Sequence, residues 1–354
     1  MTAKPDQVSS LSVGFDTLST SAEEGQSWPY KEANLGEKGV GCIASQDIKK
    51  GDLVLRESPQ LLVRPEDDTN WEDSDCFRCN ENIMKEFLKM RREDQEMYMQ
   101  LDNKYEEDHK KWSEQMKIDL IPIMRGSKEF TKLENISKGL TKQKAWEVWG
   151  RFTTNSFHNG VCLKMSRFNH ACRSNAQYFW NKDTSSRDIR ALRKIKEGEE
   201  ITVNYISALV EPRDKRRRIM KDKYNFDWNC EGCDLTEEQL QCEIENIKAY
   251  NDQKRKQKEF KEKGLLIREL EFLKKMYRLA KEIKTFSLRV FLYDIVDRAY
   301  EVSCEGFENR DRARRREDWE KDAKQFADIG LKMSKTLNGE NHSHVHRQRF
   351  GVRI

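Results

Sequence analysis

Residues 166–180 read SRFNHACRSNAQYFW, and the interpretation of the whole chain starts from this stretch. A polar segment, Asn169-His170-Ala171-Cys172, stands directly before an aromatic run. Alternating aromatic and polar residues bounded by turn residues predict a β-strand. The polar segment is therefore either an ordinary turn or a functional loop that leads into a strand.

Composition narrows the class of protein. The chain has 354 residues, enough for two packed domains, and Lys+Arg 66 nearly balance Asp+Glu 62. The net charge gives no strong case for nucleic-acid or membrane binding. No apolar run has the length of a signal-peptide core or a membrane span. We expect a monomer in the nucleus and/or cytoplasm, where nine cysteines favour metal binding or burial over disulfides.

Residue patterns predict an α+β fold, in which a β-rich unit is split by a helical insert and followed by an α-helical C-terminal domain. Strand patterns stand on both sides of a charged, glycine-poor stretch, and apolar residues recur every three or four positions near the C-terminus. The predicted segments are a flexible arm at 1–28, strands at 29–65, the insert at 66–150, strands at 151–210, a basic segment at 211–234 and helices at 235–354. The clearest helical stripes are Leu266, Leu270, Leu273 and Tyr277, and Trp319, Ala323, Phe326, Ile329 and Met333.

A short motif occurs twice, as IKKGDLV at 48–54 and as IKEGEEI at 195–201. In each copy the glycine is able to take the positive φ that a tight turn into a strand requires. We expect two similar turns that serve one sheet-rich unit, although a chance repeat of a common turn sequence is the alternative.

Four separated segments together resemble the SET-domain protein lysine methyltransferases. They are GEKGVG at 36–41, NSF at 155–157, RFNHACRSN at 167–175 and GEEITVNY at 198–205, and YNFDWNCEGC at 224–233 is similar to a post-SET segment. The insert and the helical tail most resemble the SET and MYND subfamily. A MYND zinc module is not recognisable, because Cys76 and Cys79 form one CxxC without the four ligands of a closed zinc site.

The resemblance implies an S-adenosylmethionine-dependent protein lysine N-methyltransferase that acts on a histone or another lysine-containing protein or peptide. Tyr205 would be the catalytic residue, since its hydroxyl would align the lysine amine with the methyl group. The implied cofactor-binding residues are Lys38, Gly39, Val40, Gly41, Asn155, Phe157, Asn169, His170, Tyr205, Tyr224 and Phe226. Taken singly, Asn155 equally fits a helix cap, His170 a buried histidine and each aromatic residue a packing role.

The same resemblance implies one zinc ion on Cys172, Cys230 and Cys233. Trp228 stands where the family has a further cysteine, so the fourth ligand is left open between Cys242, water and none. Ala171 and Ser174 also depart from the serine and proline that are usual in the family. The basic run at 213–223 is interpreted as a solvated helix face.

Two alternatives come from other classes of protein. The departures at Trp228, Ala171 and Ser174 favour a catalytically inactive SET-fold scaffold or peptide-binding module. The CxxC pairs and the basic run would suit a zinc-dependent nucleic-acid adaptor. Binding of S-adenosylmethionine separates the enzyme from the scaffold, and salt-sensitive binding to nucleic acid would identify the adaptor.

Overall fold

The structure is a computed structural model. It describes residues 27–63, 76–105, 142–157, 159–181, 184–206, 211–225, 230, 232–282, 289–309 and 314–338. Most of the predicted arm, as well as Phe226 and Trp228, lies outside these residues.

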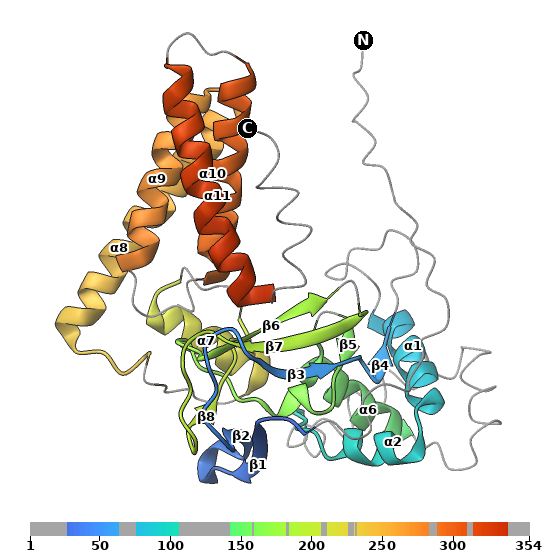
Figure 1. Cartoon of the computed structure of the whole chain (residues 1–354). Helices are drawn as coiled ribbons and strands as arrows, with labels where there is room; N and C mark the ends of the chain where they lie inside the picture. Colours follow the sequence, from blue (N-terminus) through green and yellow to red (C-terminus); the bar gives the residue numbers. More distant parts are fainter. Residues whose placement is uncertain are drawn as a thin grey trace, which may run out of the picture.

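Among the described residues, three small antiparallel sheets form the β-rich part, in the lower part of the view in Figure 1. One sheet has the order β1-β2-β8, with β1 at Tyr30–Asn34, β2 at Val40–Ala44 and β8 at Glu200–Ile201. A second has the order β3-β7-β6, with β3 at Leu53–Glu57, β7 at Ser186–Ala191 and β6 at Ala176–Asn181. The third pairs β4 (Leu61–Leu62) with β5 (Gly160–Val161). Each of the three therefore joins residues that precede the insert to residues that follow it.

The repeated motif pairs with itself. Ile48 and Ile195 form an antiparallel bridge in which each N–H donates to the other's carbonyl at 2.9 Å. Both isoleucines are fully buried, and the glycines that follow them, Gly51 and Gly198, have φ of 91° and 79°. The prediction of two similar turns in one β-rich unit is confirmed, and the motif also joins the two halves of that unit.

A continuous apolar core fills the space between the two larger sheets. Its fully buried members come from both halves of the unit: Val54 and Leu55 from β3, Phe168 from the polar segment, Ile189 from β7 and Ile201 from β8. Val54 and Leu55 are consecutive, and both are buried where the register of β3 on β7 shifts between Leu53 and Leu55. The core fixes the positions of the segments at 168–176 and 200–206, which carry most of the residues singled out in the sequence.

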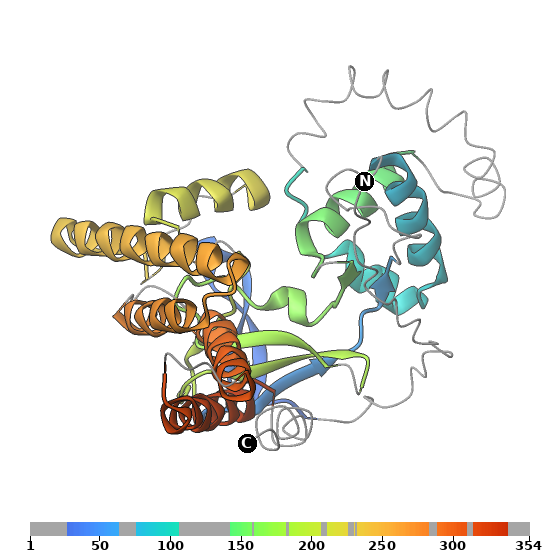
Figure 2. The same ribbon diagram turned by 90° about the horizontal axis from the view of Figure 1, so that it is seen from above.

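The insert forms its own small helical core. Helices α1 (Cys76–Lys89), α2 (Arg92–Met99) and α6 (Lys142–Asn155) pack together against β4 and β5 (Figure 2). The buried phenol of Tyr98 donates to the Val148 carbonyl at 2.7 Å and so joins α2 to α6. Helix α6 continues past the predicted boundary at residue 150 and ends at Asn155.

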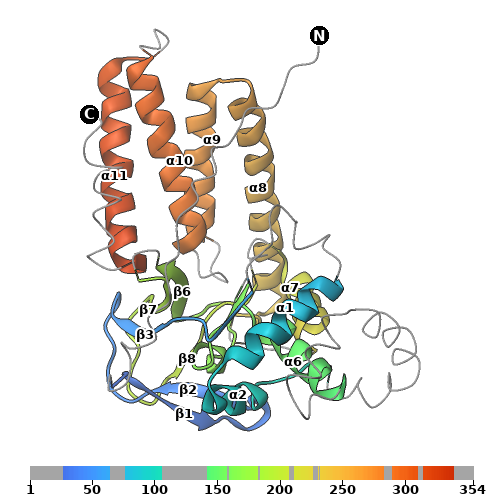
Figure 3. The same cartoon turned by 90° about the vertical axis from the view of Figure 1, so that its right-hand side faces the viewer.

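In the described part of the chain, five helices follow β8. Helix α7 (Arg213–Tyr224) ends at Asn225, which takes a left-handed conformation, and α8 (Glu237–Glu262) begins with a capping box between Thr236 and Gln239. Helices α9 (Leu266–Glu282), α10 (Arg289–Glu308) and α11 (Arg316–Asn338) complete an array with α8 in which each helix packs on the next (Figure 3). The C-terminal end of α11 packs against β6 and β7 (Figure 1).

The predicted α+β fold is confirmed. Leu270, Leu273, Trp319, Ala323 and Phe326 form part of the core of the helical array, and the other members of the two stripes pack against it. The exact boundaries of the six segments stay predictions. Among the described residues, no helix combines the length and apolar character needed to cross a membrane.

We expect Gly306→Ala to destabilise the helical array. A methyl group at Gly306 would lie 2.5 Å from two ring atoms of Trp319, which is fully buried and lies beneath the Arg314 guanidinium. Alanine normally stabilises a helix by about 1 kcal/mol relative to glycine, but overpacking a core costs about 1–3 kcal/mol. Urea unfolding should show a lower midpoint than wild type, while Gln325→Ala on the exposed face of α11 should change it little. A midpoint raised by Gly306→Ala would contradict this packing.

Candidate active site

The polar segment of the opening stretch is hydrogen-bonded to the segment after β8, which carries Tyr205. The Val203 N–H donates to the Asn169 carbonyl at 2.9 Å, and the Ala171 N–H donates to the Val203 carbonyl at 3.0 Å. His170 and Val203 thus form a parallel bridge. The Asn204 amide, which donates to the Cys172 carbonyl at 3.5 Å, extends the same seam. Two segments that are about thirty residues apart are held side by side.

His170 is buried between the two segments. Its ring is 1% exposed, and Nδ1 accepts a hydrogen bond from the Tyr205 N–H at 3.0 Å. Burial lowers the pKa of His170 to about 4, so the ring is neutral at physiological pH. Because a backbone N–H only donates, the ring proton belongs on Nε2, which lies 3.5 Å from the Cys172 sulfur. His170 is thus a buried, hydrogen-bonded histidine, which was one of its two predicted roles. Its side chain links Tyr205 to Cys172.

Tyr205 has a fixed orientation. Its hydroxyl donates to the Phe168 carbonyl at 2.6 Å, and its ring packs at 5.4 Å from His170 and at 5.2 Å from Tyr224. Burial raises the pKa of the Tyr205 phenol, which therefore stays protonated. Burial also raises the pKa of Tyr224 to about 12. The site thus contains two neutral phenols in contact, Tyr205 before α7 and Tyr224 at the end of α7.

The glycine-rich loop lies against the polar segment. Gly39 has a φ of 69°, and no atom lies within 4 Å of the position where its side chain would begin. At Gly41 an added methyl group would meet the Asn169 amide nitrogen at 2.6 Å. Val40 between them is partly exposed. Only glycine at position 41 lets the backbone and the Asn169 side chain approach this closely.

Glu200 connects these two predicted cofactor-binding segments, and the sequence analysis did not single it out. One of its carboxylate oxygens accepts from the Asn169 amide at 3.0 Å, and the other accepts from Lys38 Nζ at 2.8 Å. Lys38 belongs to the short 3₁₀ helix η1 (Gly36–Lys38). Glu200 belongs to the motif GEEITVNY, but its partners Asn169 and Lys38 are 31 and 162 residues away in the sequence. No local pattern therefore indicated these contacts.

Asn155 and Phe157 lie at the end of α6 and just after it. Both amide hydrogens of Asn155 are donated at 2.8 Å to backbone carbonyls, those of Arg151 and Asp102, so its side-chain oxygen is the group left to accept from a ligand. Asn155 therefore caps the end of α6, which was one of its two predicted roles. Phe157 packs edge-on against Tyr178 at 4.9 Å, and its carbonyl accepts from Arg187. No contact joins Phe157 directly to Asn169 or Tyr205 among the interactions described.

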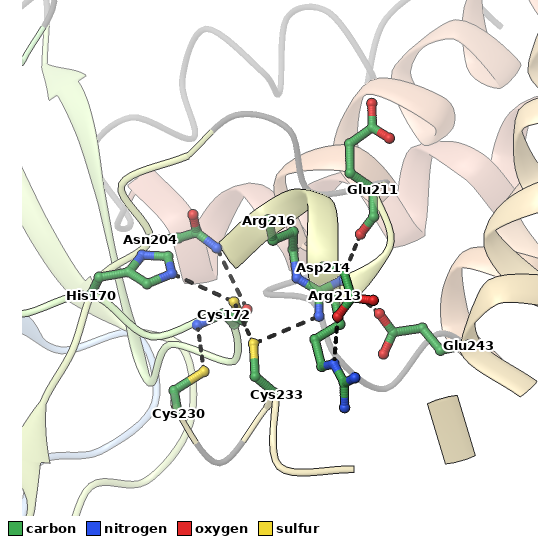
Figure 4. Close-up of polar contacts among 10 residues, drawn as sticks. All are labelled: His170, Cys172, Asn204, Glu211, Arg213, Asp214, Arg216, Cys230, Cys233 and Glu243. Carbon is green, nitrogen blue, oxygen red and sulfur yellow. Dashed lines mark hydrogen bonds and ion pairs between the residues drawn. The ribbon is translucent and has the colours of Figure 1, made fainter. Parts of the chain in front are cut away.

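The three predicted metal ligands come together, as Figure 4 shows. The sulfurs of Cys172, Cys230 and Cys233 all lie within 4.8 Å of one another, and those of Cys172 and Cys233 are 3.4 Å apart. Among the described contacts, an N–H group faces each sulfur: His170 Nε2 at Cys172, the Cys172 amide at Cys230 at 3.4 Å, and Arg216 Nη2 at Cys233 at 3.9 Å.

This donor set fits a zinc ion, since Zn²⁺ takes thiolate ligands in close tetrahedral arrangements. Cys242 is exposed on α8 and is not part of the cluster. Cys76 and Cys79 lie at the start of α1, where their side chains are not among those described.

Arg216 corrects one interpretation of the sequence. The basic run at 213–223 was expected to be a solvated helix face, and its neighbours Lys215, Arg217 and Arg218 are indeed exposed. Arg216, in contrast, is fully buried and points toward the cysteines (Figure 4). Charge alone did not reveal this, because the burial of one arginine in a basic helix depends on what packs against the helix.

Residues 39–206 match the family model of the SET domain. The chain carries a SET domain. This confirms the resemblance that the four motifs indicated, and the match contains the glycine pair, Asn155, Asn169, His170 and Tyr205.

Similar proteins agree with this assignment. A SET domain-containing protein of Acanthamoeba polyphaga mimivirus is 25% identical over 231 residues, which cover 62% of this chain and 82% of the viral protein. Histone-lysine N-methyltransferase set5 of Schizosaccharomyces pombe is 24% identical over 64% of this chain and 55% of its own length. Histone-lysine N-methyltransferase Smyd1 of Mus musculus is 38% identical over 85 residues, 21% of this chain and 17% of the mouse protein. The chain is thus similar to SET-domain methyltransferases, including SET and MYND proteins.

We predict that the cysteine cluster binds one zinc ion and that Cys172→Ser weakens this binding by at least about 100-fold, more than the loss of a ligand's hydrogen-bond partner causes. The matched control is Cys242→Ser, because Cys242 is exposed and outside the cluster. Metal content after dialysis and titration with a competing chelator would measure both variants. Equal zinc retention by wild type and Cys172→Ser would contradict the assignment of the ligands.

Proposed function

We propose that the chain is a protein lysine N-methyltransferase that uses S-adenosylmethionine. One observation carries the proposal: the hydrogen-bonded seam at Val203 holds Asn169, His170 and Tyr205 together, and Asn169 in turn packs on Gly41. The SET domain and the similarity to histone-lysine N-methyltransferases support it. The substrate would be a lysine-containing protein or peptide, and we propose a monomer acting in the nucleus and/or cytoplasm.

The glycine loop and the polar segment suit the binding of the cofactor. The open space over Gly39 would admit the methionine part to the backbone of Gly39 and Val40, with Lys38 at the edge of the loop. The side-chain oxygen of Asn155 would accept from the cofactor's ammonium group, because its amide hydrogens are already donated. Asn169 and the His170 backbone would hold the adenosine part. Aromatic walls would come from Phe157, Tyr205, Tyr224 and Phe226.

When bound, S-adenosylmethionine supplies an electrophilic methyl group. The task of the protein is then to align a neutral lysine amine with it and to exclude water. Tyr205 suits this task because its neutral phenol is held by the Phe168 carbonyl and by the His170 ring. A hydroxyl that stays protonated is able to orient the amine without adding a negative charge that would favour the ammonium form.

Zinc on Cys172, Cys230 and Cys233 would fix the segment that carries Tyr224 beside the site. Cys172 lies two residues after His170 and donates its own N–H to Cys230. The metal would therefore hold the polar segment to the start of the C-terminal region. Its chemistry would be structural, through neutralisation of the thiolates.

We expect Tyr205→Phe to lower the rate of methyl transfer by about 100-fold or more, because misalignment of reacting groups has effects of this size. Binding of S-adenosylmethionine should change little, since the ring is kept. Titration calorimetry would measure the affinity, and transfer of labelled methyl groups to a mixed protein substrate would measure the rate. Tyr277→Phe in the helical array is the matched control. No detectable binding of S-adenosylmethionine by the folded wild-type chain would contradict the proposal and favour the scaffold alternative.

We expect Glu200→Gln to weaken binding of S-adenosylmethionine by about tenfold. The carboxylate accepts from two donors, Asn169 and Lys38, and a glutamine would present its own NH₂ group to one of them. Hydrogen bonds to charged groups contribute about 1.5–3 kcal/mol, and about 1.4 kcal/mol corresponds to a tenfold change in affinity. Glu197→Gln, at an exposed position nearby, should keep wild-type affinity. If both variants bind equally well, Glu200 does not position the cofactor-binding segments.

A further inference from the structure

Arg216 occupies an unusual position for a charged side chain. Its side chain is 0% exposed, and it is among the largest fully buried side chains of the described part of the chain. Arginine is almost never fully buried unless it is paired, because removing its charge from water is costly. Its surroundings must therefore supply negative charge and hydrogen-bond acceptors.

Three contacts fix the guanidinium group (Figure 4). Nη1 donates at 2.6 Å to Glu243 Oε1 on α8 and at 2.6 Å to the Glu211 carbonyl before α7. Nη2 faces the cysteine cluster and donates to Cys233 Sγ at 3.9 Å. Glu243 is itself buried, so the ion pair holds the guanidinium in one orientation with its other side toward the sulfurs.

Charge explains why an arginine suits this place. A zinc ion with three thiolates carries one net negative charge, and this charge would be buried with Cys172 and Cys233. Among the N–H donors described at the sulfurs, the Cys172 backbone carries no charge, and the His170 ring accepts from the Tyr205 N–H at Nδ1, so this nitrogen carries no proton. Arg216 is the donor that brings a full positive charge.

We propose that Arg216 is the charge partner of a three-cysteine zinc site, held in place by Glu243. In this arrangement the guanidinium compensates the negative charge of the metal centre, and no fourth thiolate is needed at the position of Trp228. The inference rests on the zinc site proposed above, but it does not depend on methyl transfer. It makes Arg216 a positioning residue that acts on the metal through Cys233.

A purely structural role for the pair is the competing explanation, because the contact between Arg216 and Glu243 also joins α7 to α8. Replacing Arg216 alone would leave Glu243 buried without its partner, which is strongly destabilising. Replacing both residues avoids this problem, since exchanging a buried ion pair for apolar or neutral residues is often neutral for stability. Two such double variants, Arg216→Met with Glu243→Leu and Arg216→Gln with Glu243→Gln, remove the positive charge and keep the volume.

The test is the zinc affinity of the full chain, measured by competition with a chromophoric chelator without cofactor or substrate. Both double variants should bind zinc about 10–100-fold more weakly than wild type, as loss of a ligand's hydrogen-bond partner typically causes. Arg213→Met removes a charge from the same helix at a residue whose partner is Asp214, and its zinc affinity should stay at the wild-type value.

Co²⁺ substitution checks that every variant still binds metal through the same thiolates. The thiolate-to-cobalt absorption should have equal intensity in every variant, because the three cysteines are unchanged. Wild-type zinc affinity in a folded double variant would overturn the proposal and leave Arg216 as a link between helices. A wild-type chain that binds neither metal would overturn it as well. A chain that transfers no methyl groups but shows the expected loss of zinc affinity would support it, so failure of the proposed enzyme is distinguishable.

Discussion

Everything at the candidate site depends on two backbone hydrogen bonds at Val203, one from its N–H to the Asn169 carbonyl and one to its carbonyl from Ala171. Each such bond contributes only about 1 kcal/mol net, but a buried unpaired amide would cost more than that. The pairing therefore has little freedom to shift. This parallel bridge places His170 beside Tyr205, whose N–H donates to His170 Nδ1. It also places the Asn169 side chain against Gly41.

Polar burial around this seam has a consistent pattern. His170 is kept neutral, Tyr205 is kept protonated, and the buried Arg216 beside the cysteines is matched by Glu243. Buried polar groups of this kind stabilise a fold only when all of their partners are present. The site is thus a connected network in which the cysteines, the histidine and the tyrosine constrain one another, rather than a set of independent side chains.

The sequence predicted the fold class and the helical stripes, because periodicity is a local property of a chain. The grouping of Cys172, Cys230 and Cys233 was implied by the resemblance to the SET family, and these residues do come together. The sequence did not predict the partners of Glu200 or the burial of Arg216. Both depend on contacts between segments that are far apart in sequence. The sequence around Glu200 or around Arg216 is the same whether the side chain is exposed or buried, so it does not show the contact. The pairing of Ile48 with Ile195 was missed for the same reason, although the repeat itself was visible.

The place where the insert joins the β-rich unit has a consequence for how this chain tolerates change. Leu61 and Leu62 pair directly with Val161 and Gly160, so the chain leaves and re-enters the unit through one closed two-stranded neck. With both ends held together, the entropy of closing the intervening loop rises only slowly with its length. Segments of very different size are therefore able to occupy this position while the seam at Val203 keeps its geometry, which makes the neck a natural point of exchange in the evolution of the fold.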